Sequence, residues 1–286
     1  MKKYSTFKTL KSLENFISDG GTRLNNKTKQ INPKLPVITT ITVVKNSEAQ
    51  IKKTIKSILN QNYDNIEIIV IDGNSDDKTL NEIKKYENKI DYWCCIKDRG
   101  IYDAMNYGLM LSSGEVICII NSGDTFKENA LNIVSNYFIN NNNLSFLFGT
   151  VERHYLGNNM ILKTGFNRDR IKYNFDSVTC HSTGFFIKDS VQKEIGLYNL
   201  KYKCSSDYDV FFKLFKSKKY IGASTKKNEV IGVVASGGFS SKYGFWKRTL
   251  EEMSIRIDNK QNKILIFIIF VNILIKKIFK FKKSRN

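Results

Sequence analysis

The sequence feature that most constrains the fold is a short apolar run that ends abruptly in polar residues. Val116–Ile120 is continuously apolar, and the turn Asn121-Ser122-Gly123-Asp124 follows it at once. Such a run is typical of a strand buried on both faces of a parallel sheet. In open α/β sheets, ligands bind outside the carboxyl ends of the strands, which is where Asp124 would lie. The alternative is an ordinary polar turn that caps the next helix.

Two earlier segments repeat this arrangement. Val37–Val44 and Ile66–Ile71 are rich in β-branched residues, and each is followed by a segment that is typical of a helix. Strands that alternate with helices at this pace form parallel sheets. We therefore expect an α/β, Rossmann-like fold whose mostly parallel central sheet is flanked by helices. Asp72 would be a second carboxylate at the same sheet edge, and Gly100–Leu111 the helix that leads into the third strand.

The second half of the chain has longer polar segments between its apolar runs, and we expect it to carry partner specificity because loops on a scaffold vary most. The strands expected here are Leu144–Val151, Met160–Lys163 and Gly184–Ile187. Helices are expected at Glu128–Phe138, at Val210–Phe215 and at Phe245–Ile257. The segment Cys204–Asp209 precedes the second of these helices, so its serines and aspartates could simply cap that helix.

The charge of the chain favours an anionic partner. Lysine plus arginine number 46 against 27 aspartate plus glutamate, a formal net charge of +19, which suits nucleic acid, a phosphorylated substrate or a cytoplasmic membrane face. The lysines are dispersed and accompany no nucleic-acid recognition motif, so no nucleic-acid partner is expected.

Two other enzyme classes lack their motifs. A nicotinamide-dependent dehydrogenase would need Gly-x-Gly-x-x-Gly after the first strand, and a nucleotidyltransferase would need a glycine-rich phosphate loop there. The residues Val44–Glu48 contain no glycine.

The two ends of the chain differ from its centre. Residues 1–35 form a basic leader in which Phe7, Leu10, Leu13 and Phe16 recur at helical spacing, and we expect a short amphipathic helix that packs on the main domain. In the tail, residues 259–286, an apolar run from Ile264 to Ile275 is shorter than the roughly 20 residues that span a bilayer and is followed by lysines. This pattern predicts an amphipathic helix in the interface of an anionic membrane.

Five cysteines bear on the compartment. They lie at no Cys-x-x-Cys spacing, and one of them falls inside the third apolar strand, so we interpret them as free thiols in a reducing compartment. The lysine-rich N-terminus lacks the apolar core of a secretory signal peptide. We therefore expect a cytoplasmic protein, attached peripherally to the inner face of the cell membrane through its tail.

Taken in order, the motifs of residues 36–245 resemble those of family 2 inverting glycosyltransferases with the A-type nucleotide-sugar fold, and are similar to bacterial enzymes that build surface polysaccharides. The motifs that carry the resemblance are the strand Pro36–Asn46, the helix end Lys56–Gln61, the strand and acidic loop Ile68–Asp77, the segment Asp98–Asn106, and Asn121–Asp124. The last stands where the family has a metal-binding Asp-x-Asp. The first of those acids is absent here, which leaves one strong carboxylate.

The resemblance implies a role for individual residues on the donor side. Asp72 would contact the uracil or its ribose, with Thr42 and Asn46 lining the base pocket, while Asp124 would hold Mn²⁺ or Mg²⁺ on the diphosphate. The other residues that it assigns to cofactor binding are Asp98, Arg99 and Asn121.

On the acceptor side, the resemblance makes Asp207 the catalytic base, although Ser206 replaces the glutamate that often precedes it, and Asp209 is the second choice. His181 would lie near the acceptor. The Gly237–Ser240 loop would close over the nucleotide.

The implied function is transfer of a sugar from a nucleotide sugar, with UDP as the expected nucleotide, to a hydroxyl of a growing surface glycan, either free or lipid-linked. The alternative is a basic nucleic-acid-binding protein or a non-catalytic nucleotide-binding α/β protein. Residues 36–258 would form the glycosyltransferase domain, divided into a nucleotide-sugar-binding half, 36–127, and an acceptor half, 128–258.

Overall fold

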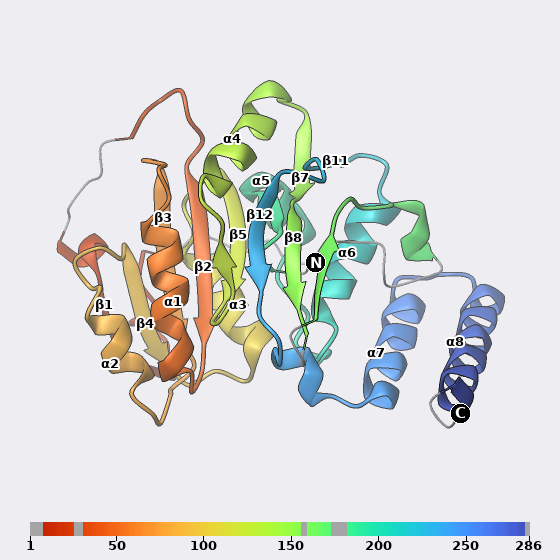
Figure 1. Cartoon of the computed structure of the whole chain (residues 1–286). Coiled ribbons are helices and arrows are strands. Elements are labelled where there is room, and N and C mark those ends of the chain that lie inside the picture. The colour runs from red at the N-terminus through yellow and green to blue at the C-terminus, as the bar shows by residue number, and fades with distance from the viewer. Residues whose placement is uncertain (1–7, 26–30, 156–158, 173–181, 284–286) are drawn as a thin grey trace.

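The computed structural model describes residues 8–25, 31–155, 159–172 and 182–283. Its main element is a twisted sheet of eight strands (Figure 1). Their order across the sheet is β1 (Phe16–Gly20), β4 (Tyr92–Ile96), β3 (Ile66–Asp72), β2 (Ile38–Val44), β5 (Val116–Asn121), β10 (Phe185–Lys188), β7 (Leu144–Phe148) and β11 (Ile221–Ser224). The four neighbours β4, β3, β2 and β5 are parallel, while β1 and β10 pair antiparallel with them. The α/β fold with a mostly parallel centre is confirmed.

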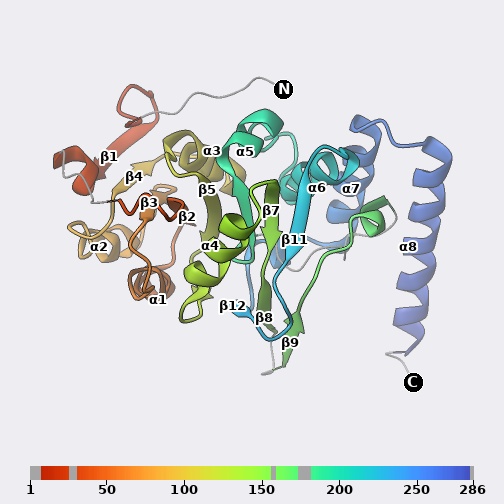
Figure 2. The same cartoon turned by 90° about the horizontal axis from the view of Figure 1, so that it is seen from above.

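Helices cover both faces of this sheet (Figure 2). One face packs against α1 (Glu48–Leu59), α2 (Thr79–Lys84) and α4 (Ala130–Asn140). The other packs against α3 (Ile101–Leu111), α5 (Asp189–Ile195) and α6 (Ser206–Lys216). Strand β2 shows why its sequence is apolar throughout: Ile41 and Val43 lie in the core on the α3 side, and Ile38 and Val44 in the core on the α1 side.

The register of the parallel strands brings their carboxyl ends to one edge. Val44 pairs with Asp72, and Val43 pairs with Asn121. The residues that follow β2, β3 and β5 therefore meet at the same edge, as the sequence predicts.

A second sheet of four strands contains β6 (Thr125–Phe126), β12 (Val230–Val234), β8 (Thr150–His154) and β9 (Met160–Lys163). The prediction of one strand over Leu144–Val151 is wrong, because the chain passes from the first sheet to the second at Gly149. A Cβ built on Gly149 would lie 1.9 Å from Cδ1 of Ile231, so only glycine allows this close approach. The sequence interpretation also missed β4, β11 and β12.

The N-terminal leader is part of the main sheet. The prediction of an amphipathic helix here is wrong: Phe16–Gly20 forms edge strand β1, antiparallel to β4, and a 3₁₀ turn, η1 (Thr22–Asn25), follows. The expectation that the leader packs on the domain is confirmed, since Leu10 is 1% exposed and lies in the core.

Two helices stand at the opposite end of the molecule (Figure 1). The helix α7 (Phe245–Asp258) packs on α6, and α8 (Lys263–Lys283) packs on α7 through Met253, Ile266 and Ile269. Among the described residues, none of the helices has the length and apolar character needed to cross a membrane.

Candidate active site

The first part of the candidate site is the edge where β2 and β3 end. Ser75 connects the two strands: its hydroxyl donates to Oδ1 of Asp72 at 2.6 Å and accepts the backbone N–H of Asn46 at 2.8 Å. Asn46 has a positive φ of 49°, which asparagine tolerates, and its Oδ1 accepts the N–H of Asp76 at 2.9 Å. The predicted donor residues Asn46 and Asp72 are therefore brought together by one loop.

Asp98 lies against this loop. A Cβ on Gly73 would come within 2.3 Å of its Oδ2, so the absence of a side chain at Gly73 lets the Asp98 carboxylate sit beside Asp72. Burial raises the pKa of Asp98, which the N–H of Gly100 and the charge of Lys45 oppose. Its neighbour Arg99 is exposed and donates to Asp103 through the backbone N–H and the guanidinium, each at 3.0 Å.

The turn after β5 is fixed by α1. Gly123 has a φ of 100°, a conformation that favours glycine. The hydroxyl of Thr54 accepts the N–H of Gly123 at 2.9 Å and donates to the carbonyl of Asp124 at 2.8 Å. The hydroxyls of Ser122 and Ser47 lie 2.8 Å apart, which joins this turn to the end of β2.

The Asp124 carboxylate is 6% exposed and lies among hydrogen-bond donors from distant segments. Its Oδ2 accepts the hydroxyls of Thr183 at 2.8 Å and Ser182 at 3.2 Å, and its Oδ1 accepts the N–H of Ala235 at 2.9 Å. Burial raises the pKa of Asp124 above its ordinary value, although these three donors and the charge of Arg153 lower it. Asp124 thus holds the start of β10 and the loop after β12 against the end of β5.

Part of the donor set fits a bound ligand or cation. Within the described residues, the buried Oγ1 of Thr42 and Oδ1 of Asn121 have no hydrogen-bond partner, although buried polar atoms are nearly always paired. Both were predicted to face the donor. The described part of the chain contains no group of three His, Cys, Asp or Glu side chains that could hold a metal ion. A cation here would rest on oxygen atoms of Asp124 and Asn121 and on oxygens of its ligand.

Asp207 lies in the first turn of α6 and is half-buried. Its Oδ1 accepts the phenol O–H of Tyr102 at 2.9 Å and its own helix's N–H at Tyr208, at 3.0 Å. Tyr102 in turn packs edge-to-face against Phe239 of η3 (Phe239–Lys242), with ring centroids 6.4 Å apart. Since Tyr102 follows Asp98 and Gly100 closely in the chain, the structure brings Asp207 beside the donor-side segment.

The remaining two predicted residues do not join this group. Asp209 is 2% exposed; it pairs with Lys213 one turn along α6 and accepts Nδ2 of Asn259, the residue that follows α7, at 2.7 Å. Asp209 therefore joins α6 to the end of α7. His181 lies outside the described residues, and the two residues that follow it bind Asp124.

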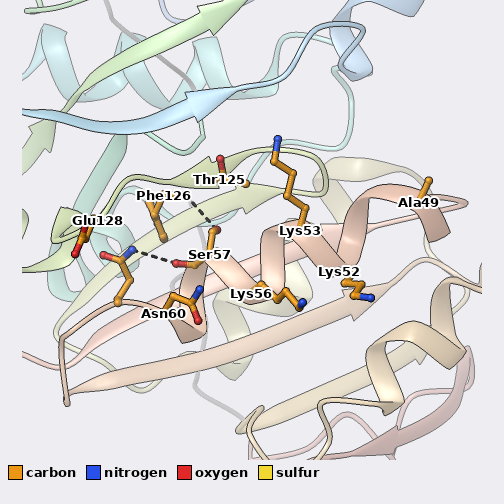
Figure 3. Close-up of a pocket in the computed structure, with 10 residues that line it drawn as sticks. Ala49, Lys52, Lys53, Lys56, Ser57, Asn60, Thr125, Phe126 and Glu128 are labelled. Atoms are coloured by element: carbon orange, nitrogen blue, oxygen red, sulfur yellow. Dashed lines mark hydrogen bonds between the residues drawn. The ribbon is translucent and has the colours of Figure 1, made fainter.

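A separate surface groove of about 730 Å³ lies along the outer side of α1 (Figure 3). Lys52, Lys53 and Lys56 of α1 line one side of it, and Thr125 and Phe126 of β6 line the other. Asp72, Asp98 and Asp207 are not among its lining residues, so this groove is distinct from the predicted site.

Comparison with known proteins identifies the family. The family model described as Glycosyl transferase family 2 matches residues 39–196, more than half of the chain. The chain belongs to glycosyltransferase family 2. The match runs from β2 through β10 and α5, and so includes Asp72, Asp98 and Asp124 of this glycosyltransferase.

Relatives in sequence carry glycosyltransferase names. An uncharacterized glycosyltransferase of Mycobacterium tuberculosis is 37% identical over 93 residues, which are 32% of this chain and 36% of that protein. A PGL/p-HBAD biosynthesis glycosyltransferase of Mycobacterium bovis is 26% identical over 186 residues, 64% of this chain and 71% of that protein. The chain thus spans only about a third of the length of the first of these relatives.

Solved structures share the fold at low sequence identity. Residues 1–349 of TarS from S. aureus, in complex with UDP-GlcNAc, have a TM-score of 0.62 at 16% identity, and the match covers 83% of this glycosyltransferase and 71% of that chain. The mannosyltransferase PcManGT from Pyrobaculum calidifontis, in complex with GDP-Man and Mn²⁺, has a TM-score of 0.55 at 14% identity, over 87% and 73% of the two chains. These matches confirm the predicted A-type fold.

The site of this glycosyltransferase includes residues that the sequence interpretation did not select. Ser75, Tyr102, Ser182 and Thr183 each contact a predicted residue. Ser75 could have been found, because Asp-x-x-Ser after a strand is typical of a turn in which the aspartate accepts from the serine. Tyr102 carries no such signal, since an aromatic residue early in a helix is usually part of the core.

Proposed function

We propose that this family 2 glycosyltransferase is an inverting enzyme that moves a sugar from a UDP-sugar to a hydroxyl group. The proposal rests on the convergence of Asn46, Asp72 and Asp98 at one sheet edge. The segment that begins at Asp98 also contains Tyr102, whose hydroxyl donates to Asp207. Polar groups at that edge suit a nucleotide, and a carboxylate opposite them suits a base.

On the donor side, Asp72 and Asn46 would receive the base and ribose, and Thr42, which is fully buried in β2, would form the floor of the base pocket. The unpaired Oδ1 of Asn121 would be left for the cation. The choice of UDP is supported by TarS, whose structures contain UDP-GlcNAc and UDP. PcManGT contains GDP-Man, which makes a guanine nucleotide the competing choice.

On the acceptor side, the carboxylate of Asp207 would accept the proton of the attacking hydroxyl, so that the oxygen gains nucleophilicity as it approaches the sugar. Its half-buried position at the start of α6 leaves it accessible while the helix N-terminus favours its negative charge. The loop after β12, held by Asp124 at Ala235 and by Tyr102 at Phe239, would exclude water from the reacting groups.

A divalent cation, Mn²⁺ or Mg²⁺, would be held by Asp124 with Asn121 and the donor diphosphate. When bound, it would neutralise the charge that builds on the leaving diphosphate. The Mn²⁺ of PcManGT supports this choice of ion. Because Asp124 is the only predicted carboxylate ligand, we expect cation and nucleotide to bind together.

The acceptor is proposed to be a growing surface glycan, either free or lipid-linked. The name of the Mycobacterium bovis relative, a PGL/p-HBAD biosynthesis glycosyltransferase, supports a biosynthetic role. The tail would hold the enzyme on the inner face of the cell membrane, beside such an acceptor. Support comes from α8, whose Ile264, Phe267 and Ile268 are more than half exposed.

Titration calorimetry with UDP and GDP, with and without Mn²⁺, tests the donor and the metal. We expect Mn²⁺ to tighten UDP binding at least about tenfold, ~1.4 kcal/mol, and Asp124→Ala to abolish that gain. A panel of nucleotide sugars in thermal-shift assays, followed by measurement of UDP release with membrane lipid extract as acceptor, then identifies the donor.

Binding that is indifferent to both Mn²⁺ and Asp124→Ala would refute the metal assignment. Tighter binding of GDP than of UDP would overturn the choice of nucleotide, and the lack of any nucleotide binding would refute the donor site itself.

A further inference from the structure

The phenol of Tyr102 occupies a fixed position between the two halves of the site. Tyr102 lies in the first turn of α3 and is 7% exposed. Its ring packs against Tyr198 and Phe239, with centroids 5.6 and 6.4 Å away. Two segments that are distant in sequence therefore hold this ring in place.

The hydroxyl of Tyr102 is aimed at the predicted base. It donates to Oδ1 of Asp207 over 2.9 Å. Burial raises the pKa of Tyr102 well above its ordinary value, and the negative charge of Asp207 adds to the shift. The phenol therefore stays protonated at neutral pH and can act only as a donor toward the carboxylate. Hydrogen bonds to ionised acceptors are among the stronger ones in proteins.

The backbone that carries Tyr102 is itself fastened to the donor side. Gly100 donates its N–H to Oδ1 of Asp98 at 3.0 Å, and Asp103 accepts the N–H and guanidinium of Arg99. The position of the Tyr102 hydroxyl is thus set by the segment that lies against the nucleotide edge. Asp207, in contrast, begins a helix of the other half of the chain.

We propose that Tyr102 is a positioning residue for Asp207: its phenol fixes one carboxylate oxygen relative to the donor edge and leaves the carboxylate aimed at the acceptor hydroxyl. This inference rests on the proposed role of Asp207 as base. A tyrosine that only fills the core would act through its ring, whereas a positioning tyrosine acts through its hydroxyl.

The variants Tyr102→Phe, Asp207→Asn and the double variant separate the two roles, because phenylalanine keeps the ring. Turnover is measured as UDP release, with the nucleotide sugar that gives the largest thermal shift in the panel as donor and membrane lipid extract as acceptor. Tyr107→Phe is the matched control: it removes another phenol from α3, which accepts Nδ2 of Asn15 at 2.8 Å and is remote in its contacts from Asp207.

We expect Tyr102→Phe to lower kcat about 10- to 100-fold, the usual worth of a hydrogen bond to a charged group, with the donor KM and donor-induced thermal stabilisation unchanged. Tyr107→Phe should leave kcat within about twofold, since the hydrogen bond that it removes is to Asn15 of the leader and not to Asp207. In the Asp207→Asn background, Tyr102→Phe should cause no further loss, because residues that act as a unit are not additive.

Several results would overturn the inference: full kcat in Tyr102→Phe, an equal loss in Tyr107→Phe, losses that multiply in the double variant, or loss of donor-induced stabilisation. Normal turnover in Asp207→Asn, or an inactive Asp209→Asn beside an active Asp207→Asn, would instead refute the base assignment and with it this inference. If Asp207→Asn is impaired while Tyr102→Phe is normal, only the inference fails.

Discussion

Asp124 serves two demands at once in this enzyme. As a carboxylate it is the proposed cation ligand, yet it is buried and accepts hydrogen bonds from Ser182, Thr183 and Ala235. Burial of a charge costs free energy, which is why the pKa of Asp124 is raised in spite of these donors. A bound cation would offset that cost.

The raised pKa of Asp124 predicts a pH-dependent stability difference. The pKa of Asp124 in the folded state lies above 3.8, the ordinary pKa of the carboxyl group, so the folded state holds this proton more tightly than the unfolded state. The stability that Asp124 contributes through this proton is therefore fully present below pH 3.8 and is lost as the pH rises through the raised pKa of the folded state. Relative to Asp124→Asn, the wild-type protein without metal should gain stability as the pH falls from 7 toward 4.

Urea denaturation of both proteins at several pH values measures this difference, since the titration of all other groups cancels in it. A wild-type advantage that grows with rising pH would contradict the raised pKa. Addition of Mn²⁺ with UDP at pH 7 should favour the wild type over Asp124→Asn, because only the native carboxylate can bind the cation.

Residues at the ends of elements were the ones that the sequence could reveal. Asp72 ends one apolar strand and Asp124 lies in the turn after another, so the residue pattern places these two at one sheet edge. Asp207 begins a helix, and only the family resemblance selected it. Asp209 lies two positions along the same helix, and about 200° around it, which turns it toward α7. Sequence could not choose between them without knowing which face of α6 meets α3.

The sequence predicted helices and strands where the residue pattern is local. It failed where a strand is decided by pairing with a segment far away in the chain. The leader has helical spacing in Leu10, Leu13 and Phe16, yet Phe16–Gly20 pairs with β4, more than 70 residues away. That pairing is decided by an open edge of the sheet, which no local period encodes. The break at Gly149 has the same origin, because Ile231 of a distant strand requires it.

The ion pair of Arg23 and Glu67 tests whether the leader is integral to the domain. Glu67 is 8% exposed and accepts Nη2 of Arg23 at 2.6 Å, and it also accepts the N–H of Ser113 at 2.8 Å. Arg23→Ala removes the cation of the leader while Glu67 keeps its bonds to Thr39 and Ser113, so the buried carboxylate loses its partner and we expect a loss of about 3 kcal/mol in the free energy of unfolding. Guanidinium denaturation followed by circular dichroism measures it.

The control is Glu194→Ala, which breaks the exposed pair with Lys219 and should cost less than about 1 kcal/mol. Equal effects of the two substitutions would show that the contact between leader and sheet contributes little to stability.

Exposed apolar side chains and positive charge gather at one end of the molecule. Half of the exposed large apolar side chains among the described residues lie on α7 and α8, including Trp246, Leu250 and Phe267. After Asp258 the sequence has eight lysines or arginines and no acidic residue. Phe267 and Ile268 of α8 are more than half exposed and are not part of the apolar cluster between α7 and α8. We propose that an anionic membrane covers this face, because it offers both an apolar interior and negative charge.

We expect the end formed by α7 and α8 to bind anionic membranes. Each lysine near an anionic surface contributes about 1 kcal/mol, and full burial of a Phe or Ile side chain roughly 1.5 to 3 kcal/mol, less at an interface. Flotation should recover the enzyme with anionic vesicles and much less with neutral ones. Phe267→Ser with Ile268→Ser should lower binding about tenfold or more, while Ile139→Ser, an exposed isoleucine of α4, should not.

The double serine variant is a more specific test than removal of α8, because Phe267 and Ile268 are not part of the cluster of Met253, Ile266 and Ile269 that joins α8 to α7. A chain that ends at Gln261 should lose binding altogether, since it lacks both the apolar face and the terminal lysines. Equal flotation of the wild type and these variants would refute the membrane-binding end. Binding that withstands high salt and alkaline carbonate would be incompatible with peripheral attachment, because salt screens the lysines and interfacial helices are released under such conditions.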